Sequence, residues 1–249
     1  MTALPLVLLH AFPVDARMWD AVRAPLSERF RLITPDQRGL GRSPLPETER
    51  EPGLDDAARD VVALLDRLEL DQVVLGGCSM GGYLTMAVLR IAPERVGGLV
   101  FIDTKATADT PEAVQARHDL ADRVEAEGAG WLAETVTPGL LAEKTRADRP
   151  EVAGRLGELI TAQPPSGIAW AARAMAARPD SVELLRSADV PALVVVGEED
   201  GLTPPAAANT LVEALPDATL VVLPEVGHLT PLEDPAGVVE AILGWYSAD

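Results

Sequence analysis

Short apolar runs alternate with longer amphipathic stretches along most of this chain, and this alternation limits its fold more than any other feature. The runs are rich in β-branched residues, as in strands that are buried inside a parallel sheet. Strands that alternate with helices form a parallel sheet with helices on both faces, so the pattern predicts an α/β fold of about six strands. The predicted strands, most of them apolar enough to be fully buried, are 6–10, 31–35, 73–76, 98–102, 192–196 and 219–223.

Helical periodicity fills the stretches between these runs. Residues 55–68 carry apolar side chains at helical spacing, and 83–91 is apolar nearly all round, which predicts a buried helix. Two later helices are predicted to start where Thr203 and Asp234 each precede a proline, because such residues cap the free N–H groups of a first turn.

The strand pattern stops between residues 105 and 189, where several helical stretches are separated by glycines and prolines. A chain of 249 residues suits one core with an insertion better than two domains. We therefore predict an α/β core at 1–104 and 190–249 and an inserted helical cap at 105–189. The apolar residues of this cap either roof a pocket or bury against one another; they are Leu120, Val124, Trp131, Leu132, Leu140, Leu141, Trp170 and Met175.

Composition excludes several classes of partner and location. The net charge of −18 repels nucleic-acid backbones and anionic lipid surfaces. The single cysteine, Cys78, allows no internal disulfide, and no apolar run is long enough to be a signal sequence or to span a membrane. We expect a cytoplasmic monomer or homodimer that binds a small-molecule substrate and neither nucleic acid nor membrane.

The sequence Gly77-Cys78-Ser79-Met80-Gly81 matches the pattern G-x-S-x-G and lies between a predicted buried strand and a predicted helix. A sharp strand-to-helix turn of this kind exposes its serine and needs small residues on both sides. The N-terminus of the following helix offers N–H groups and partial positive charge to a developing oxyanion. Ser79 is therefore the predicted nucleophile.

A serine nucleophile needs a base, and histidine is suited to this task near neutral pH. Of three histidines, His228 follows the last predicted strand in a loop, which places it at the edge of the sheet where catalytic groups gather. His10 comes too early for the chain order serine, acid, histidine, and His118 lies in the cap among charged residues.

The histidine in turn needs a carboxylate that fixes its tautomer. Asp200 follows the predicted strand 192–196 and is the preferred candidate. Its rivals are Glu198, Glu199 and Asp103, of which Asp103 ends the preceding strand at the same edge of the sheet.

An oxyanion hole requires two backbone donors, one after the nucleophile and one after an early strand. The N–H groups of Met80 and Phe12 fit these positions. Because the base, the acid and these donors all come from the chain, the predicted chemistry needs no metal and no organic cofactor.

Together these segments resemble the α/β-hydrolase family, specifically its small capped branch of carboxylesterases, 3-oxoadipate enol-lactonases and cofactor-free haloperoxidases. The resemblance covers nearly the whole chain, departs from the family where Ala11 replaces the usual glycine, and rests on 8–13, 36–43, 77–82, 197–200 and 227–228. It implies a Ser79–His228–Asp200 triad that cleaves a carboxylic ester, lactone or thioester through an acyl-enzyme. The same triad also serves enol-lactone opening, C–C bond hydrolysis or perhydrolysis, and a non-catalytic ligand receptor on this fold is the alternative from another class.

Overall fold

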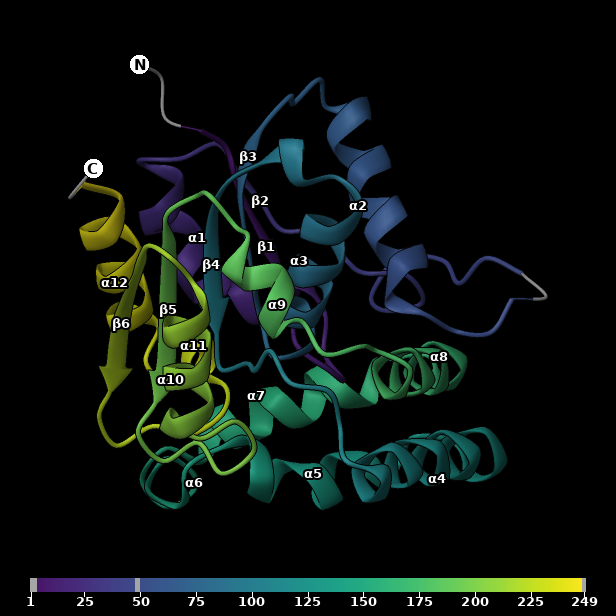
Figure 1. Ribbon diagram of the computed structural model, residues 1–249. Coiled ribbons are helices and arrows are strands. Elements are labelled where there is room, and N and C mark those ends of the chain that lie inside the picture. Colours follow the sequence, from purple (N-terminus) through teal and green to yellow (C-terminus); the bar gives the residue numbers. More distant parts are fainter. Residues whose placement is uncertain (1–3, 48–49, 248–249) are drawn as a thin grey trace.

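Six parallel strands form one sheet in the computed structural model, which describes residues 4–47 and 50–247 (Figure 1). Their order across the sheet is β2-β1-β3-β4-β5-β6. The strands are β1 (Leu6–Leu9), β2 (Leu32–Ile33), β3 (Val73–Cys78), β4 (Val96–Ile102), β5 (Ala192–Gly197) and β6 (Ala218–Leu223). Each strand falls within or next to one predicted run, so the predicted α/β fold class is confirmed. The outermost residues of the predicted core, 1–3 and 248–249, lie outside the described residues.

The inner strands are buried, but the prediction of full burial is wrong for the two edge strands. Every residue of β1, β3 and β5 is buried, whereas β2 and most of β6 are half-buried or exposed. An edge strand has a neighbour on one side only, so solvent reaches side chains that a central strand would cover. The runs 31–35 and 219–223 are apolar, and apolarity alone does not distinguish an edge from a centre.

Helices cover both faces of the sheet, as predicted. One face carries α1 (Asp20–Ser27), α11 (Thr230–Glu233) and α12 (Pro235–Ser247), where α12 packs on β5, β6 and α1. The other face carries α2 (Leu54–Arg67), α3 (Met80–Ile91), α9 (Val182–Arg186) and α10 (Pro205–Ala214), where α3 packs on the three central strands β1, β3 and β4. Short 3₁₀ turns are η1 (Ala16–Trp19) and η2 (Pro93–Arg95).

Five further helices gather at the end of the sheet toward which the strands run (Figure 1). They are α4 (Pro111–Glu127), α5 (Leu132–Leu140), α6 (Glu143–Asp148), α7 (Pro150–Thr161) and α8 (Pro165–Ala176). Helix α4 packs along α8, and α5 packs on α7. This group of helices therefore stands over the carboxyl ends of the strands, where an open α/β sheet places its ligands.

Gln163, between α7 and α8, ties these helices to the core. Its amide nitrogen donates to Oδ2 of Asp15 at 2.7 Å, and its amide oxygen accepts from the backbone N–H of Gly41, also at 2.7 Å. Asp15 lies just after β1 and Gly41 just after β2, so one buried side chain bridges both loops to the cap.

The two predicted helix caps have different outcomes. Asp234 caps α12, since its Oδ1 accepts a hydrogen bond from the N–H of Gly237 at 2.9 Å. The predicted cap at Thr203 is wrong, because α10 begins only at Pro205 and the Thr203 hydroxyl donates to Asp200 instead. Among the described residues, no helix has both the length and the apolar character needed to cross a bilayer.

Candidate active site

Ser79 occupies the turn between β3 and α3 in a backbone conformation that side chains rarely adopt, with φ 53° and ψ −111°. The turn is possible because its flanks are glycines. A Cβ on Gly81 would lie 2.1 Å from the carbonyl oxygen of Leu9, and one on Gly77 would lie 2.3 Å from the carbonyl carbon of Gly81. Close packing of this turn against β1 therefore fixes the place at which the Ser79 hydroxyl is presented.

The structure brings the three predicted triad residues into one hydrogen-bonded chain. Nε2 of His228 lies 2.8 Å from Oγ of Ser79, and Nδ1 of His228 lies 2.8 Å from Oδ2 of Asp200. His228 comes from the loop after β6 and Asp200 from the loop after β5, while Ser79 follows β3. Both the histidine and the aspartate are buried, so little water competes for these bonds.

Asp200 is held as an acceptor on both of its oxygens. Oδ1 accepts from the N–H groups of Leu202 and Thr203, and Oδ2 accepts from the Thr203 hydroxyl at 2.7 Å. Burial favours the protonated form of Asp200, but hydrogen bonds from His228 and Thr203 outweigh it and hold the pKa below the ordinary aspartate value. An ionised Asp200 is the form that can fix the tautomer of His228 and stabilise its imidazolium.

The rival acids have other surroundings. The oxygens of Asp103 accept from Thr230, Gly197 and the Cys78 thiol, and none of its hydrogen bonds to described residues reaches His228. Burial and the nearby Asp200 charge raise the pKa of Asp103 well above its ordinary value. Glu198 and Glu199 are both exposed.

Neither of the two other histidines is hydrogen-bonded to the Ser79 hydroxyl, which among the described residues pairs with His228. His10 is fully buried, with its Nδ1 2.9 Å from the carbonyl oxygen of Ala11 and its Nε2 accepting from the N–H of Gln37 at 2.9 Å. Burial lowers its pKa, so a neutral imidazole braces the loop that follows β1. His118 lies in α4 of the cap.

A cavity of about 460 Å³ opens on the triad; we call it the catalytic cavity. The core contributes Ser79, His228 and Phe12 to its wall, and Lys105 joins them from the segment after β4. The cap contributes a mixed set of apolar and charged side chains that includes Arg117, Val136, Leu140 and Met175. The sequence did not decide which apolar residues of the cap cover a pocket and which pack against one another. Leu140 and Met175 line this cavity. Val124 and Leu132 are fully buried instead.

The predicted oxyanion donors flank the nucleophile. Met80 is the first residue of α3, and Phe12 shares the wall of the catalytic cavity with Ser79. The peptide bond between Phe12 and Pro13 is cis. Neither the N–H of Phe12 nor that of Met80 donates to another of the described residues, so both donors remain available to a ligand.

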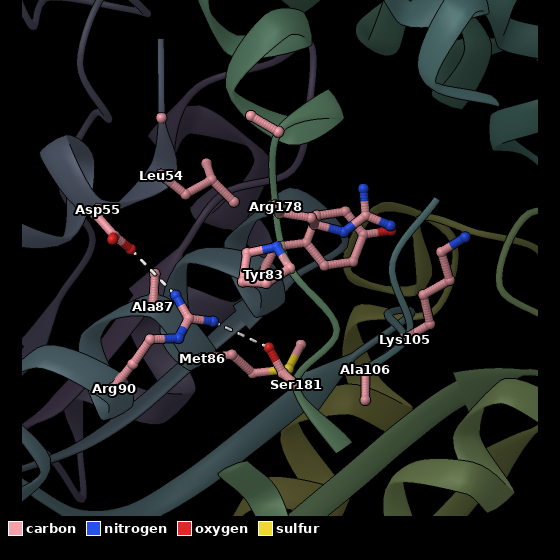
Figure 2. A pocket seen from close by; sticks show the side chains of 13 residues that line it. Leu54, Asp55, Tyr83, Met86, Ala87, Arg90, Lys105, Ala106, Arg178 and Ser181 are labelled. Atoms are coloured by element: carbon pink, nitrogen blue, oxygen red, sulfur yellow. Dashed lines mark hydrogen bonds and ion pairs between the residues drawn. The ribbon is translucent and has the colours of Figure 1, made fainter. Parts of the chain in front are cut away.

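A smaller pocket of about 110 Å³ adjoins the catalytic cavity, and Tyr83 and Lys105 line both (Figure 2). Figure 2 shows the Arg178 guanidinium stacked over the Tyr83 ring, 4.0 Å from the ring centre, with Lys105 on the same side. At the other end, Arg90 contacts Asp55 and Ser181. Tyr83 and Lys105 therefore stand in the wall between the two spaces.

Several residues around the site were not predicted from the sequence. Thr203, which orients Asp200, was interpreted as a helix cap, and Thr230 was not singled out. The cations Lys105 and Arg117 of the catalytic cavity were also missed. A signal existed for Lys105 alone, because it follows the strand β4 closely at the catalytic edge of the sheet. Among the described residues, no cluster of three or more histidine, cysteine or acidic side chains is arranged to hold a metal ion.

Comparison with known proteins identifies relatives that are named as an esterase and as enol-lactonases. The chain is 41% identical to a thermophilic esterase from Thermogutta terrifontis, solved with malate bound, over 99% of this chain and 90% of that one, with a TM-score of 0.95. It is 26% identical to the enol-lactonase from Burkholderia xenovorans LB400, over 98% of this chain and 92% of that one, with a TM-score of 0.89. It is also 29% identical to 3-oxoadipate enol-lactonase 2 of Acinetobacter baylyi, over 96% of this chain and 88% of the relative.

The family assignment rests on most of the chain. The sequence profile described as the alpha/beta hydrolase fold matches residues 5–235, which include all six strands, the cap and the three triad residues. The order of the parallel strands, the strained serine turn and the Ser79–His228–Asp200 hydrogen bonds are consistent with that match. This chain belongs to the α/β-hydrolase family.

Proposed function

We propose that this protein hydrolyses a carboxylic ester of a small organic substrate, with Ser79 as nucleophile, His228 as base and Asp200 as the orienting acid. The observation that carries the proposal is the pair of 2.8 Å contacts that join the three side chains at the wall of the catalytic cavity. Activation of a serine requires a base within hydrogen-bond reach and a third group that orients the base, and this geometry supplies both.

The reaction has two acyl-transfer steps. Oγ of Ser79 attacks the ester carbonyl while Nε2 of His228 takes the hydroxyl proton, and the resulting imidazolium then gives this proton to the departing alcohol. The acyl group stays on Ser79 as an ester. In the second step His228 takes a proton from water, the hydroxide attacks the acyl-enzyme, and the acid leaves as Oγ recovers the proton.

Each tetrahedral intermediate carries a negative oxygen that needs donors. The unpaired N–H groups of Phe12 and Met80 suit this role, and α3 adds the partial positive charge of its N-terminus. The strained backbone at Ser79 supports the same role, because it turns the hydroxyl and the following N–H toward one side of the turn.

The named relatives favour an ester as the type of bond that this protein cleaves. An esterase and two enol-lactonases are among the proteins that the chain resembles, and an enol-lactone is a cyclic ester, so one mechanism serves both. Simple ester cleavage is our proposal, and enol-lactone opening is the second candidate. C–C hydrolysis, perhydrolysis and a purely ligand-binding role have no specific contact in their favour.

Hydrolysis of 4-nitrophenyl butyrate by the native chain and by Ser79→Ala tests the proposal. Because Ser79 is the only proposed acyl acceptor, kcat should fall by about 10⁴-fold or more, with circular dichroism unchanged. A burst of nitrophenol equal to the enzyme concentration would show the acyl-enzyme. Turnover by folded Ser79→Ala close to that of the native chain would contradict the assignment.

A further inference from the structure

Four charged residues meet where the cap adjoins the sheet; we call them the Asp109 cluster, formed by Lys105, Asp109, Arg117 and Arg178. Lys105 follows β4 at the catalytic edge of the sheet, and Arg117 projects from α4 of the cap. Lys105, Asp109 and Arg117 line the catalytic cavity together with Ser79 and His228.

Asp109 is the centre of this cluster. Nη1 and Nη2 of Arg178 bind its two oxygens at 2.6 and 2.7 Å, and Nε of Arg117 donates to Oδ2 at 2.6 Å. Nζ of Lys105 lies 3.2 Å from Oδ1. Burial favours the protonated form of Asp109, but its bonds to Arg178 and Arg117 outweigh it and hold the pKa far below the ordinary value, so Asp109 is a carboxylate.

One carboxylate does not neutralise three cations. The cluster therefore has three positive charges against one negative charge, a net charge of +2, in a chain whose net charge is −18. Arg178 alone is sufficient to pair with the buried charge of Asp109, because it binds both carboxylate oxygens. The pair is almost fully buried, with 5% of the Arg178 side chain and 1% of the Asp109 side chain exposed. Lys105 and Arg117 add two positive charges beyond the one that neutralises Asp109, and their side chains remain 24% and 25% exposed.

Both of these cations keep free donors. Arg117 uses its Nε for Asp109 and its Nη1 for the sulfur of Met175, and its Nη2 makes no hydrogen bond to any of the described residues. The Lys105 ammonium has three N–H groups and a single ionic neighbour, Asp109, among those residues. Asp109 thus contacts both side chains while N–H groups of each remain without a hydrogen-bond partner among the described residues.

We propose that Lys105 and Arg117 form a subsite for a carboxylate carried by the substrate, so that the enzyme prefers esters with a free carboxylate on the acid or on the alcohol part. This inference rests on the proposed ester hydrolysis and adds the substrate class. A carboxylate bound there lowers the net charge of the cluster from +2 to +1, and the cavity walls around it reduce screening by solvent. With a neutral ester of the same shape, the two cations share the single negative charge of Asp109 with Arg178.

Two matched substrate pairs test the preference and locate the charge. The acid-side pair is the 4-nitrophenyl monoester of glutaric acid and its methyl ester, which differ by one charge and one methyl group. The alcohol-side pair is 3-acetoxybenzoate and methyl 3-acetoxybenzoate. We expect kcat/KM for the charged member of one pair to exceed that for the neutral member by about 10-fold or more.

Removal of each cation should abolish this preference selectively. In Lys105→Gln and in Arg117→Gln, the ratio of kcat/KM for the charged ester to kcat/KM for its neutral partner should fall by about 10-fold relative to the native chain. Arg186→Gln is the control, since it removes one positive charge from the exposed helix α9, away from the cavity wall. A circular dichroism spectrum like that of the native chain shows that each variant folds.

Failure of the subsite and failure of the hydrolase can be told apart. If the native chain cleaves charged and neutral esters equally well in both pairs, the subsite is overturned and the hydrolase stands. If no ester is cleaved, calorimetry with glutarate and neutral glutaramide decides: glutarate should bind, and Lys105→Gln and Arg117→Gln should each weaken its binding by about 10-fold. Equal binding of glutarate and glutaramide, or no binding of either, would overturn the subsite.

Discussion

Asp103 accepts two hydrogen bonds from Thr230 across 127 positions of the sequence, one from its backbone N–H at 2.9 Å and one from its hydroxyl at 2.8 Å. The other Asp103 oxygen accepts from the N–H of Gly197 at 3.2 Å. Thr230 closely follows His228, and Gly197 closely precedes Asp200. One fully buried carboxyl group thus ties together the two loops that carry the acid and the base.

Thr230→Val should lower kcat more than it alters KM. The substitution keeps the branched shape but removes the hydroxyl donor to Asp103, which loosens the loop of His228, so we expect kcat to fall by about 3- to 10-fold with KM within about 2-fold. Thr230→Ser, which keeps the hydroxyl, is the matched control and should retain native kcat. Equal losses in the two variants would show that packing of the methyl group, rather than the hydrogen bond, sustains the loop.

Asp200→Asn should reduce kcat by about 10⁴-fold, because an amide cannot hold His228 in the tautomer that accepts the Ser79 proton. Steady-state ester hydrolysis measures this loss. Glu199→Gln is the control, since Glu199 is the exposed neighbour of Asp200 in the same loop and should keep native kcat. If Glu199→Gln lost most of its kcat while Asp200→Asn kept it, the orienting acid would be Glu199 and the assignment of Asp200 would be wrong.

Gly81→Ala should destabilise the protein by about 3 kcal/mol or more, because the added Cβ would meet the backbone of Leu9 at 2.1 Å and neither backbone segment can move easily. Gly157→Ala in α7 is the matched control. Apart from the neighbouring backbone of α7 itself, its added Cβ would meet no described atom within 4 Å, so we expect the substitution to stabilise the protein by about 0.5–1 kcal/mol through helix propensity. Urea denaturation of both variants provides the comparison.

Protonation of Asp15 at low pH should weaken its hydrogen bonds to Arg17 and to Gln163, which joins the core to the cap. Burial acts to raise the pKa of Asp15, but hydrogen bonds from Arg17 and Gln163 outweigh it and lower the pKa from 3.8 to about 2. Because the pKa is depressed in the folded state, this stability is fully present above pH 3.8 and is lost as the pH falls through 2.

Asp15→Asn should therefore lower the free energy of unfolding near neutral pH by about 1–2 kcal/mol, a value that allows for solvent screening at the half-exposed Arg17. The difference from the native chain should shrink below pH 3.8 and nearly vanish near pH 2. Urea denaturation across this range measures it. A difference that stays constant with pH would contradict the role of the Asp15 charge.

Local sequence patterns were enough to predict the strands of the sheet and the three residues Ser79, His228 and Asp200 that the structure joins by hydrogen bonds. The strands are apolar runs, and the G-x-S-x-G turn, Asp200 and His228 each follow a strand closely, so parallel pairing brings them to one edge. The half-exposed edges β2 and β6 were not predictable, because strand order depends on pairing between distant segments. The role of Thr203 was missed because a hydroxyl before a proline satisfies the rule for a helix cap equally well.

The Asp109 cluster shows the same limit more clearly. Arg178 reaches Asp109 across 69 positions, and only the packing of α4 along α8 brings the residues near them together. Nothing in the spacing of these charges along the chain distinguishes them from charges on a solvated helix face. A binding role for Lys105 and Arg117 can be inferred only from the cavity that they line, which the sequence does not reveal.

The most direct test of the catalytic assignment is reaction with a fluorophosphonate probe, followed by intact mass and peptide mapping of the native chain and Ser79→Ala. An activated serine attacks the phosphorus and retains the phosphonyl group, so we predict one adduct per native chain, located at Ser79, and none on the variant. An unlabelled native chain that is well folded, or labelling that persists in Ser79→Ala, would contradict Ser79 as the nucleophile.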